Sequence, residues 1–151
     1  MRRRRFTNLR ADRSGVTSVD FALIALPLLL LVFGTVEFGR LLWAREALQM
    51  AAIQGARCIG VLQTSCAQAG AFDATSAKNY IISAAGAWGI VLTTGSMTVT
   101  ANATTGPCSG LSSQVSEVTI NYTFQTAVPG LLTMLSGGKA LTGHACFPKQ
   151  T

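Results

Sequence analysis

The chain contains few of the side chains that perform catalysis or bind metal ions. Among its 151 residues there is one histidine, His144, and only six residues are Asp or Glu. None of the four cysteines forms a C-x-x-C pair, and their spacing from the histidine fits no zinc pattern. Without a nucleophile–base pair or a phosphate-binding loop, the sequence predicts a protein that is not an enzyme and that uses no cofactor, metal or small-molecule substrate.

Positive charge is also scarce after the first fifteen residues. The formal net charge is +6, and most of it lies before Val16, where six arginines stand against one aspartate (Arg2, Arg3, Arg4, Arg5, Arg10, Arg13 and Asp12). The remainder is nearly neutral, so it offers no basic patch for phosphate contacts. The charge distribution therefore argues against a nucleic-acid partner.

One long apolar run follows the basic leader directly. Val16 to Val36 carries a single charged residue, Asp20, and as a helix it would span about 31 Å, enough to cross a membrane. A secretory signal would have a shorter apolar core ending in a small-x-small site, and Gly34 to Phe38 offers no clean site of that kind. Arginines before an apolar run favour a cytoplasmic N-terminus. We therefore expect a retained membrane anchor, with the rest of the chain exported.

The four cysteines all follow this run. An even number on the exported side of a membrane predicts two disulfides. If the last two strands pair antiparallel, Cys146 lies near Cys108, which favours Cys108–Cys146 and leaves Cys58 to pair with Cys66. Four cysteines permit three pairings, and the other two stay open at this stage.

Apolar residues at helical spacing predict one long helix and one short helix. From Val16 the helix continues to about Cys58, with one apolar face formed by small and aliphatic residues (Leu41, Ala44, Leu48, Ala51, Ala52, Gly55 and Ile59). Asp73 is placed to cap the second helix. The apolar stripe of that helix is expected to comprise Ala77, Ile81, Ala84, Trp88 and Val91.

Alternating apolar and polar residues predict strands at 97–102, 118–125 and 139–147. The expected fold is α+β: a transmembrane helix continues into a small exported domain with a second helix and an antiparallel sheet of about three strands. The expected domains are a basic leader that is cleaved, a long transmembrane helix and an exported disulfide-bonded domain, at residues 1–15, 16–60 and 61–151. A separate apolar segment, Leu131 to Leu135, is expected to cap the core or to contact the membrane or a partner.

Gly15 and Asp20 suggest a mechanism. A carboxylate in a membrane segment costs roughly 2.5 to 3.5 kcal/mol on insertion scales. Cleavage after Gly15 would free the amine of Val16, and Asp20 of a staggered neighbouring subunit could neutralise it. In the alternative interpretation, Gly15 is a linker glycine and Asp20 simply favours the N-terminus of the helix. These residues alone leave both interpretations open.

The stretch from Gly15 to Arg57 resembles the TadE-like family, whose members are pilin-like components of the tight-adherence (Flp-type) pilus machinery. The resemblance rests on a series of matching stretches: Gly15 to Leu23, Pro27 to Leu31, Phe33-Gly34, Glu37 to Arg40, Ala44-Arg45, Ala47 to Gln49, Ala51-Ala52 and Gly55 to Arg57. After residue 60 the likeness is only general.

The resemblance implies cleavage after Gly15 by a prepilin-type peptidase, which would leave Val16 as the new N-terminus. It also implies an acid followed by an aromatic residue, here Asp20 and Phe21, although glutamate is the usual acid and aspartate is one methylene shorter. The other helix positions that the family pattern marks are Pro27, Glu37, Arg40, Arg45 and Arg57.

The function that the resemblance implies is that of a minor pilin or pseudopilin, which packs through its N-terminal helix against other pilin-like subunits during pilus assembly. Its expected location is the bacterial inner membrane, with the C-terminal domain periplasmic, or the surface pilus itself. The alternative is a single-pass, membrane-anchored exported binding domain that has no role in a filament.

Overall fold

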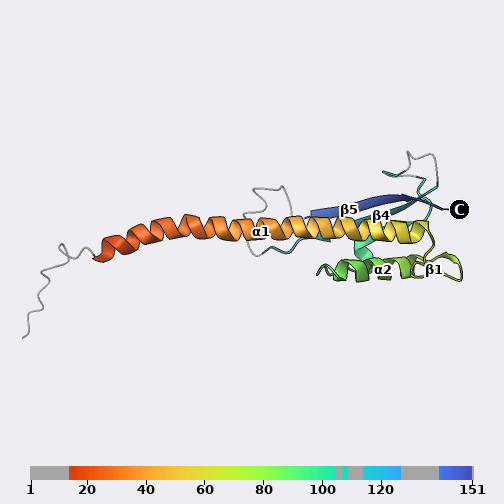
Figure 1. Ribbon diagram of the computed structural model, residues 1–151, viewed down its shortest axis with the longest axis horizontal. Helices are drawn as coiled ribbons and strands as arrows, with labels where there is room; N and C mark the ends of the chain where they lie inside the picture. Colours follow the sequence, from red (N-terminus) through yellow and green to blue (C-terminus); the bar gives the residue numbers. More distant parts are fainter. Residues whose placement is uncertain (1–13, 105–106, 109–113, 127–139, 151) are drawn as a thin grey trace, which may run out of the picture. The chain divides into compact units, whose positions relative to one another are not determined.

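The computed structural model describes the chain except for residues 1–13, 105–106, 109–113, 127–139 and 151 (Figure 1). Most of the predicted leader and the segment Leu131 to Leu135 lie outside the described residues. The chain forms two compact units, unit 1 (Met1–Phe38) and unit 2 (Gly39–Thr151). The α+β class is confirmed, because a long apolar helix, a second helix and antiparallel sheets follow one another along the chain.

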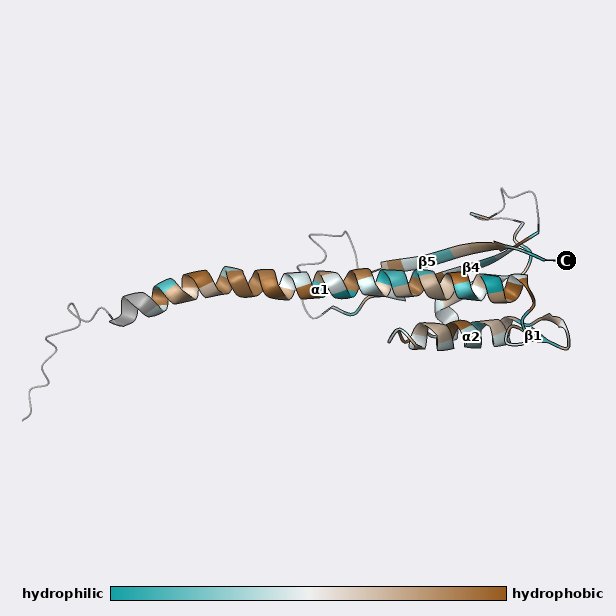
Figure 2. Cartoon of the chain, viewed as in Figure 1, coloured by the Kyte–Doolittle hydropathy of each residue, from teal (hydrophilic) through white to brown (hydrophobic). Residues whose placement is uncertain are grey.

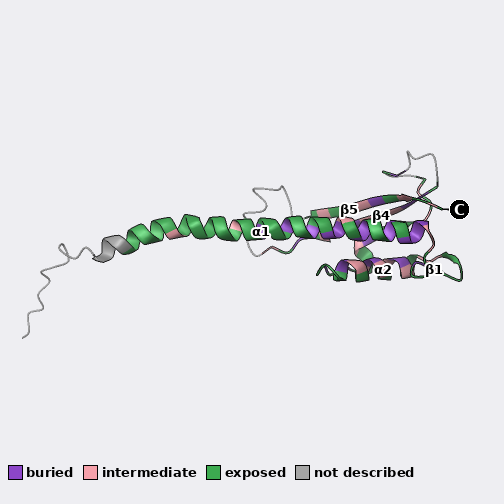
Figure 3. Cartoon of the chain, in the orientation of Figure 1, coloured by how far each residue is buried: buried purple, intermediate pink, exposed green. Residues whose placement is uncertain are grey.

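Helix α1 runs from Ser14 to Gly60 and begins two residues before the predicted start at Val16. In unit 1 its large apolar side chains are exposed, among them Phe21, Leu23, Leu30 and Phe33 (Figures 2 and 3). Among the described residues, this is the one helix long and apolar enough to cross a membrane. An apolar surface of this size requires lipid or other helices to cover it.

In unit 2 the same helix buries the face predicted from the sequence. Leu41, Leu48 and Ile59 are buried, as are the small residues between them (Ala44, Ala51, Ala52 and Gly55). Small side chains let the sheet come close to the helix: a Cβ built on Gly143 would lie 2.6 Å from the carbonyl oxygen of Leu48. The apolar face of α1 is therefore the centre of the core.

The main sheet has three strands, β3 (Met97–Thr100), β4 (Val115–Thr123) and β5 (Ala140–Pro148), in the order β3-β4-β5. Both pairings are antiparallel, so the predicted arrangement of the last two strands is confirmed. Val118 and Ile120 of β4 are fully buried. The alternation that predicted these strands is therefore the alternation between core and surface.

A second sheet, which was not predicted from the sequence, consists of two short strands. Strands β1 (Ala67–Gln68) and β2 (Ala71–Phe72) pair antiparallel. The two residues between them, Ala69 and Gly70, both have positive φ, at 52° and 79°. Positive φ at both positions is the requirement of a type I′ turn.

Helix α2 extends from Ala74 to Gly86. Asp73 caps its N-terminus, as predicted, because its carboxylate accepts a hydrogen bond of 2.7 Å from the amide of Ser76. The buried positions are Ala77, Ile81 and Ala85. The predicted continuation of the stripe through Ala84, Trp88 and Val91 is wrong. The helix ends at Gly86, and Trp88 and Val91 beyond it are exposed.

Candidate functional site

The first turns of α1 contain the residues expected to control processing and assembly. Gly15 and Val16 lie within the helix, whereas the cleavage hypothesis has the chain extended at this point. The first four amides of a helix have no partner within it, so this turn opens at lower cost than the helix interior. Asp20 and Phe21 follow one turn later, and both are exposed.

Val16 and Asp20 are four residues apart in a continuous helix, so they lie on the same face. If the chain is cut after Gly15, an amine and a carboxylate therefore stand one turn apart in the same subunit.

The other positions of the family pattern have different surroundings. Pro27 lies inside α1, and Glu37 is buried, with 5% of its surface exposed. Arg45 and Arg57 are exposed.

The guanidinium of Arg40 packs over the ring of Phe124 in unit 2. Its Cζ atom lies 5.7 Å from the centroid of the Phe124 ring, and that ring is buried at 4% exposure. A cation over an aromatic face is attracted by the ring quadrupole. Arg40 therefore ties α1 to the chain segment that follows β4.

Two disulfides brace unit 2. Cys58 is bonded to Cys66, and Cys108 is bonded to Cys146. The first closes the connection between α1 and β1, and the second joins the loop before β4 to the end of β5. Among the described residues there is no free cysteine.

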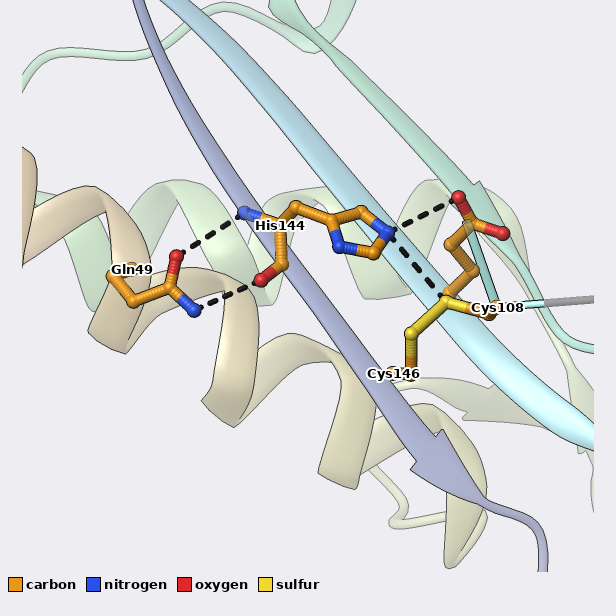
Figure 4. Close-up of polar contacts among 5 residues, drawn as sticks. Gln49, Cys108, His144 and Cys146 are labelled. Atoms are coloured by element: carbon orange, nitrogen blue, oxygen red, sulfur yellow. Dashed lines mark hydrogen bonds and ion pairs between the residues drawn. A yellow bond between two sulfur atoms is a disulfide. The ribbon is translucent and has the colours of Figure 1, made fainter. Parts of the chain in front are cut away.

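His144 occupies a polar cluster that the sequence did not predict (Figure 4). Its Nε2 atom lies 3.2 Å from Oε1 of Glu117 and 3.5 Å from Sγ of Cys108. Its backbone is held from the other side by Gln49, whose Nε2 donates to the carbonyl oxygen at 2.8 Å and whose Oε1 accepts from the amide at 3.3 Å. His144 is therefore a half-buried residue that links α1, β4 and the disulfide.

The sulfur atoms of Cys108 and Cys146 and a ring nitrogen of His144 lie within 4.8 Å of one another. Thiolates, and not disulfides, are the sulfur ligands of metal ions. Because the two sulfurs are bonded to each other at 2.04 Å, this cluster is a disulfide beside an imidazole and not a set of three metal ligands.

A buried hydroxyl makes a further link between helix and sheet. Oγ of Ser116 lies 2.7 Å from the carbonyl oxygen of Ala56 and 3.0 Å from that of Phe147, and Ser116 is fully buried. Its single hydrogen is shared between two acceptors, one in α1 and one in β5. The polar groups of unit 2 thus hold the helix against the sheet.

Comparison with known proteins points to the N-terminal helix. No curated protein and no solved structure matches the chain. The region that matches a family model is confined to α1 and covers less than a third of the chain. It includes Gly15, Asp20 and every other position discussed above as far as Arg57. Residues 15–57 match the model of the TadE-like protein family, which associates this segment with tight-adherence pilus systems.

Proposed function

We propose that this protein is a minor pilin or pseudopilin that takes part in assembly of a tight-adherence pilus. The observation that carries the proposal is the family match over residues 15–57, on a helix whose apolar side chains in unit 1 are exposed. Such a helix can lie in lipid before assembly and against other pilin-like helices afterwards. The protein acts as a structural subunit and not as an enzyme.

In this proposal residues 1–15 are a leader held on the cytoplasmic side by its arginines. Residues 16–60 form the pilin-like helix, and residues 61–151 form the periplasmic domain. A prepilin-type peptidase cuts after Gly15. The Gly15–Val16 bond lies in the first turn of α1, so only that turn must unwind before the peptidase can bind the bond in an extended conformation.

The charge of Asp20 acts after cleavage. In a single subunit the freed amine of Val16 and the Asp20 carboxylate lie on the same helical face. On assembly, a staggered neighbour exchanges these partners, so each buried charge keeps a counter-charge while the helices pack. The shorter side chain of aspartate requires a closer approach between the two helices than glutamate would.

The first test is the N-terminus of the mature protein. The chain is produced with a prepilin-type peptidase, and intact mass spectrometry of the membrane fraction should give a polypeptide that starts at Val16. Gly15→Leu should abolish processing and leave membrane insertion intact. Gly34→Leu makes the same substitution away from the cleavage bond and should be processed normally. An uncut wild-type chain would refute the proposed maturation.

The second test separates a filament subunit from an anchored binding domain. Asp20→Asn should be cleaved but should lose association with other subunits and lower the amount of sheared pili, whereas Asp20→Glu should retain both. Glu46→Gln, a neutralisation at an exposed position of the same helix, serves as the control. Pilus output that is unchanged in Asp20→Asn would instead favour the single-pass exported binding domain.

A further inference from the structure

Unit 2 exposes a group of apolar side chains away from the core, which we call the tryptophan corner and define as Trp43, Trp88 and Val91. Their exposed fractions are 57%, 40% and 84%. The two indole rings lie 5.5 Å apart, tilted by 59°. Scattered apolar residues are normal on a protein surface. Here, however, the two indole rings are in contact, and the exposed Val91 follows Trp88 by only three residues, which favours an apolar partner.

The backbone holds the tryptophan corner in place. Nε1 of Trp43 donates a hydrogen bond of 3.3 Å to the carbonyl oxygen of Trp88. The chain then turns at Gly89, whose φ is +78°, and the amide of Ile90 donates to the carbonyl oxygen of Ala85 at 3.1 Å. This is the bonding of a helix C-cap with a left-handed glycine.

This cap decides which side chains face outwards. Ile90 and Leu92 are buried, at 7% and 5% exposure, so Val91 between them is directed to the surface. The hydrogen bond from Trp43 fixes Trp88 at the same end of α2. The exposed apolar group is therefore produced by ordered structure and not by a loose loop.

The chemistry of the tryptophan corner fits a lipid–water interface. Tryptophan is enriched there because its ring is apolar and its N–H is polar. The segment from Asn79 to Ser116 contains no Asp, Glu, Lys or Arg, so burial of Trp88 and Val91 in lipid desolvates no charge of their own segment. Trp43 lies in the same helix as the candidate membrane run and only seven residues after Val36.

We propose that the tryptophan corner inserts into the interfacial layer of the membrane that α1 crosses and gives unit 2 a second attachment to the bilayer. In this attachment the exposed side chains of Trp43, Trp88 and Val91 contact lipid. The attachment requires only that the apolar run of α1 anchors the protein. It is independent of leader cleavage and of pilus assembly.

The test uses the full chain in vesicles of phosphatidylethanolamine and phosphatidylglycerol. Because the chain has two tryptophans, Trp43→Phe leaves Trp88 as the only indole. We expect its emission to be quenched by lipids brominated close to the headgroup, and less by lipids brominated near the chain end. Val91→Asp in the same background should reduce this quenching. Emission unaffected by either lipid would overturn the proposal.

A second measurement does not depend on the removal of Trp43. Val91→Cys and the exposed α2 position Asn79→Cys are each labelled with a polarity-sensitive dye in the otherwise unchanged chain. The dye at position 91 should shift to the blue in vesicles relative to the dye at position 79. Equal emission from both sites would contradict the proposal. Crosslinking between copies through position 91, in place of lipid contact, would show that a second subunit covers the corner and would also overturn it.

Discussion

The side chain of Gln49 pairs with the backbone of His144 as a neighbouring strand would, because its carboxamide both donates to the carbonyl and accepts from the amide. His144 is opposite Thr119 in the sheet, and its amide and carbonyl point away from β4. An unpaired strand edge invites pairing with another chain. One glutamine of α1 therefore caps the outer edge of β5 at this point.

Removal of this cap should lower the free energy of unfolding. Gln49→Ala leaves the amide and carbonyl of His144 without their partner in a partly buried position, and the expected loss is about 1–3 kcal/mol. Gln49→Glu should also destabilise the protein, because a carboxylate cannot donate to the carbonyl. Urea unfolding of the full chain in detergent measures both. Gln54→Ala, at an exposed position of the same helix, should be nearly neutral; a comparable loss there would contradict this account.

Gly143 is expected to tolerate no side chain. A Cβ there would lie 2.6 Å from the oxygen and 2.8 Å from the carbonyl carbon of Leu48, and a helix backbone cannot move aside easily. Gly143→Ala should therefore destabilise the protein by about 1–3 kcal/mol, the usual cost of overpacking. Gly39→Ala is the matched control, since no heavy atom lies within 4 Å of its Cβ. That substitution should raise the thermal midpoint, because alanine favours a helix interior.

The turn between β1 and β2 can be improved. Ala69 has a φ of 52°, and a left-handed conformation costs an ordinary residue roughly 1–2 kcal/mol. Ala69→Asn should recover part of this, about 0.5–1 kcal/mol, because asparagine is favoured in type I′ turns. Thermal unfolding at one pH measures the change. Ala71→Asn, two residues further in β2, should bring no gain.

Asp73 should make the stability of unit 2 dependent on pH. The backbone amide of Ser76, which donates to this carboxylate, lowers the pKa of Asp73 from its ordinary value of 3.8. A lowered pKa in the folded state means that the stabilisation is complete above the unfolded value and is lost as pH falls through the folded value. Asp73→Ala should therefore lower the thermal midpoint at neutral pH. This difference should shrink below pH 3.8. Asp73→Ser keeps a capping oxygen that does not titrate, so its thermal midpoint at neutral pH should fall less than that of Asp73→Ala, and its difference from the wild type should also shrink in acid.

The sequence predicted those helices and strands in which the apolar residues repeat regularly over many positions. Leu41, Leu48 and Ile59 recur at helical spacing over several turns, and β4 alternates from Glu117 to Thr123. Each of these patterns identifies the buried face of its element. The expected antiparallel pairing of β4 and β5 placed Cys146 near Cys108 and so favoured the two disulfides that the structure contains. The helix segment that resembles TadE-like proteins was recognisable from the order of its residues.

The remaining features depend on contacts that no local pattern encodes. Strands of two residues, such as β1, are too short to show alternation. The stripe of α2 fails at Trp88 because Gly86 and Gly89 end the helix, and the ring then packs on Trp43 instead of the core. Gln49 has the position of a solvent-facing residue in the helical pattern, and its partner His144 is 95 residues away.

The polar links between α1 and the rest of unit 2 have a mechanical consequence. Several hydrogen bonds link α1 to other parts of the unit. Gln49 bonds to His144, the carbonyl of Ala56 accepts from Ser116, and the carbonyl of Gly60 accepts from the amide of Gln150. A pull on the N-terminal half of α1 reaches the sheet through these bonds together with the apolar packing around them. Bonds loaded in parallel share the force and yield together, so the attachment of α1 to the sheet resists a pull along the helix.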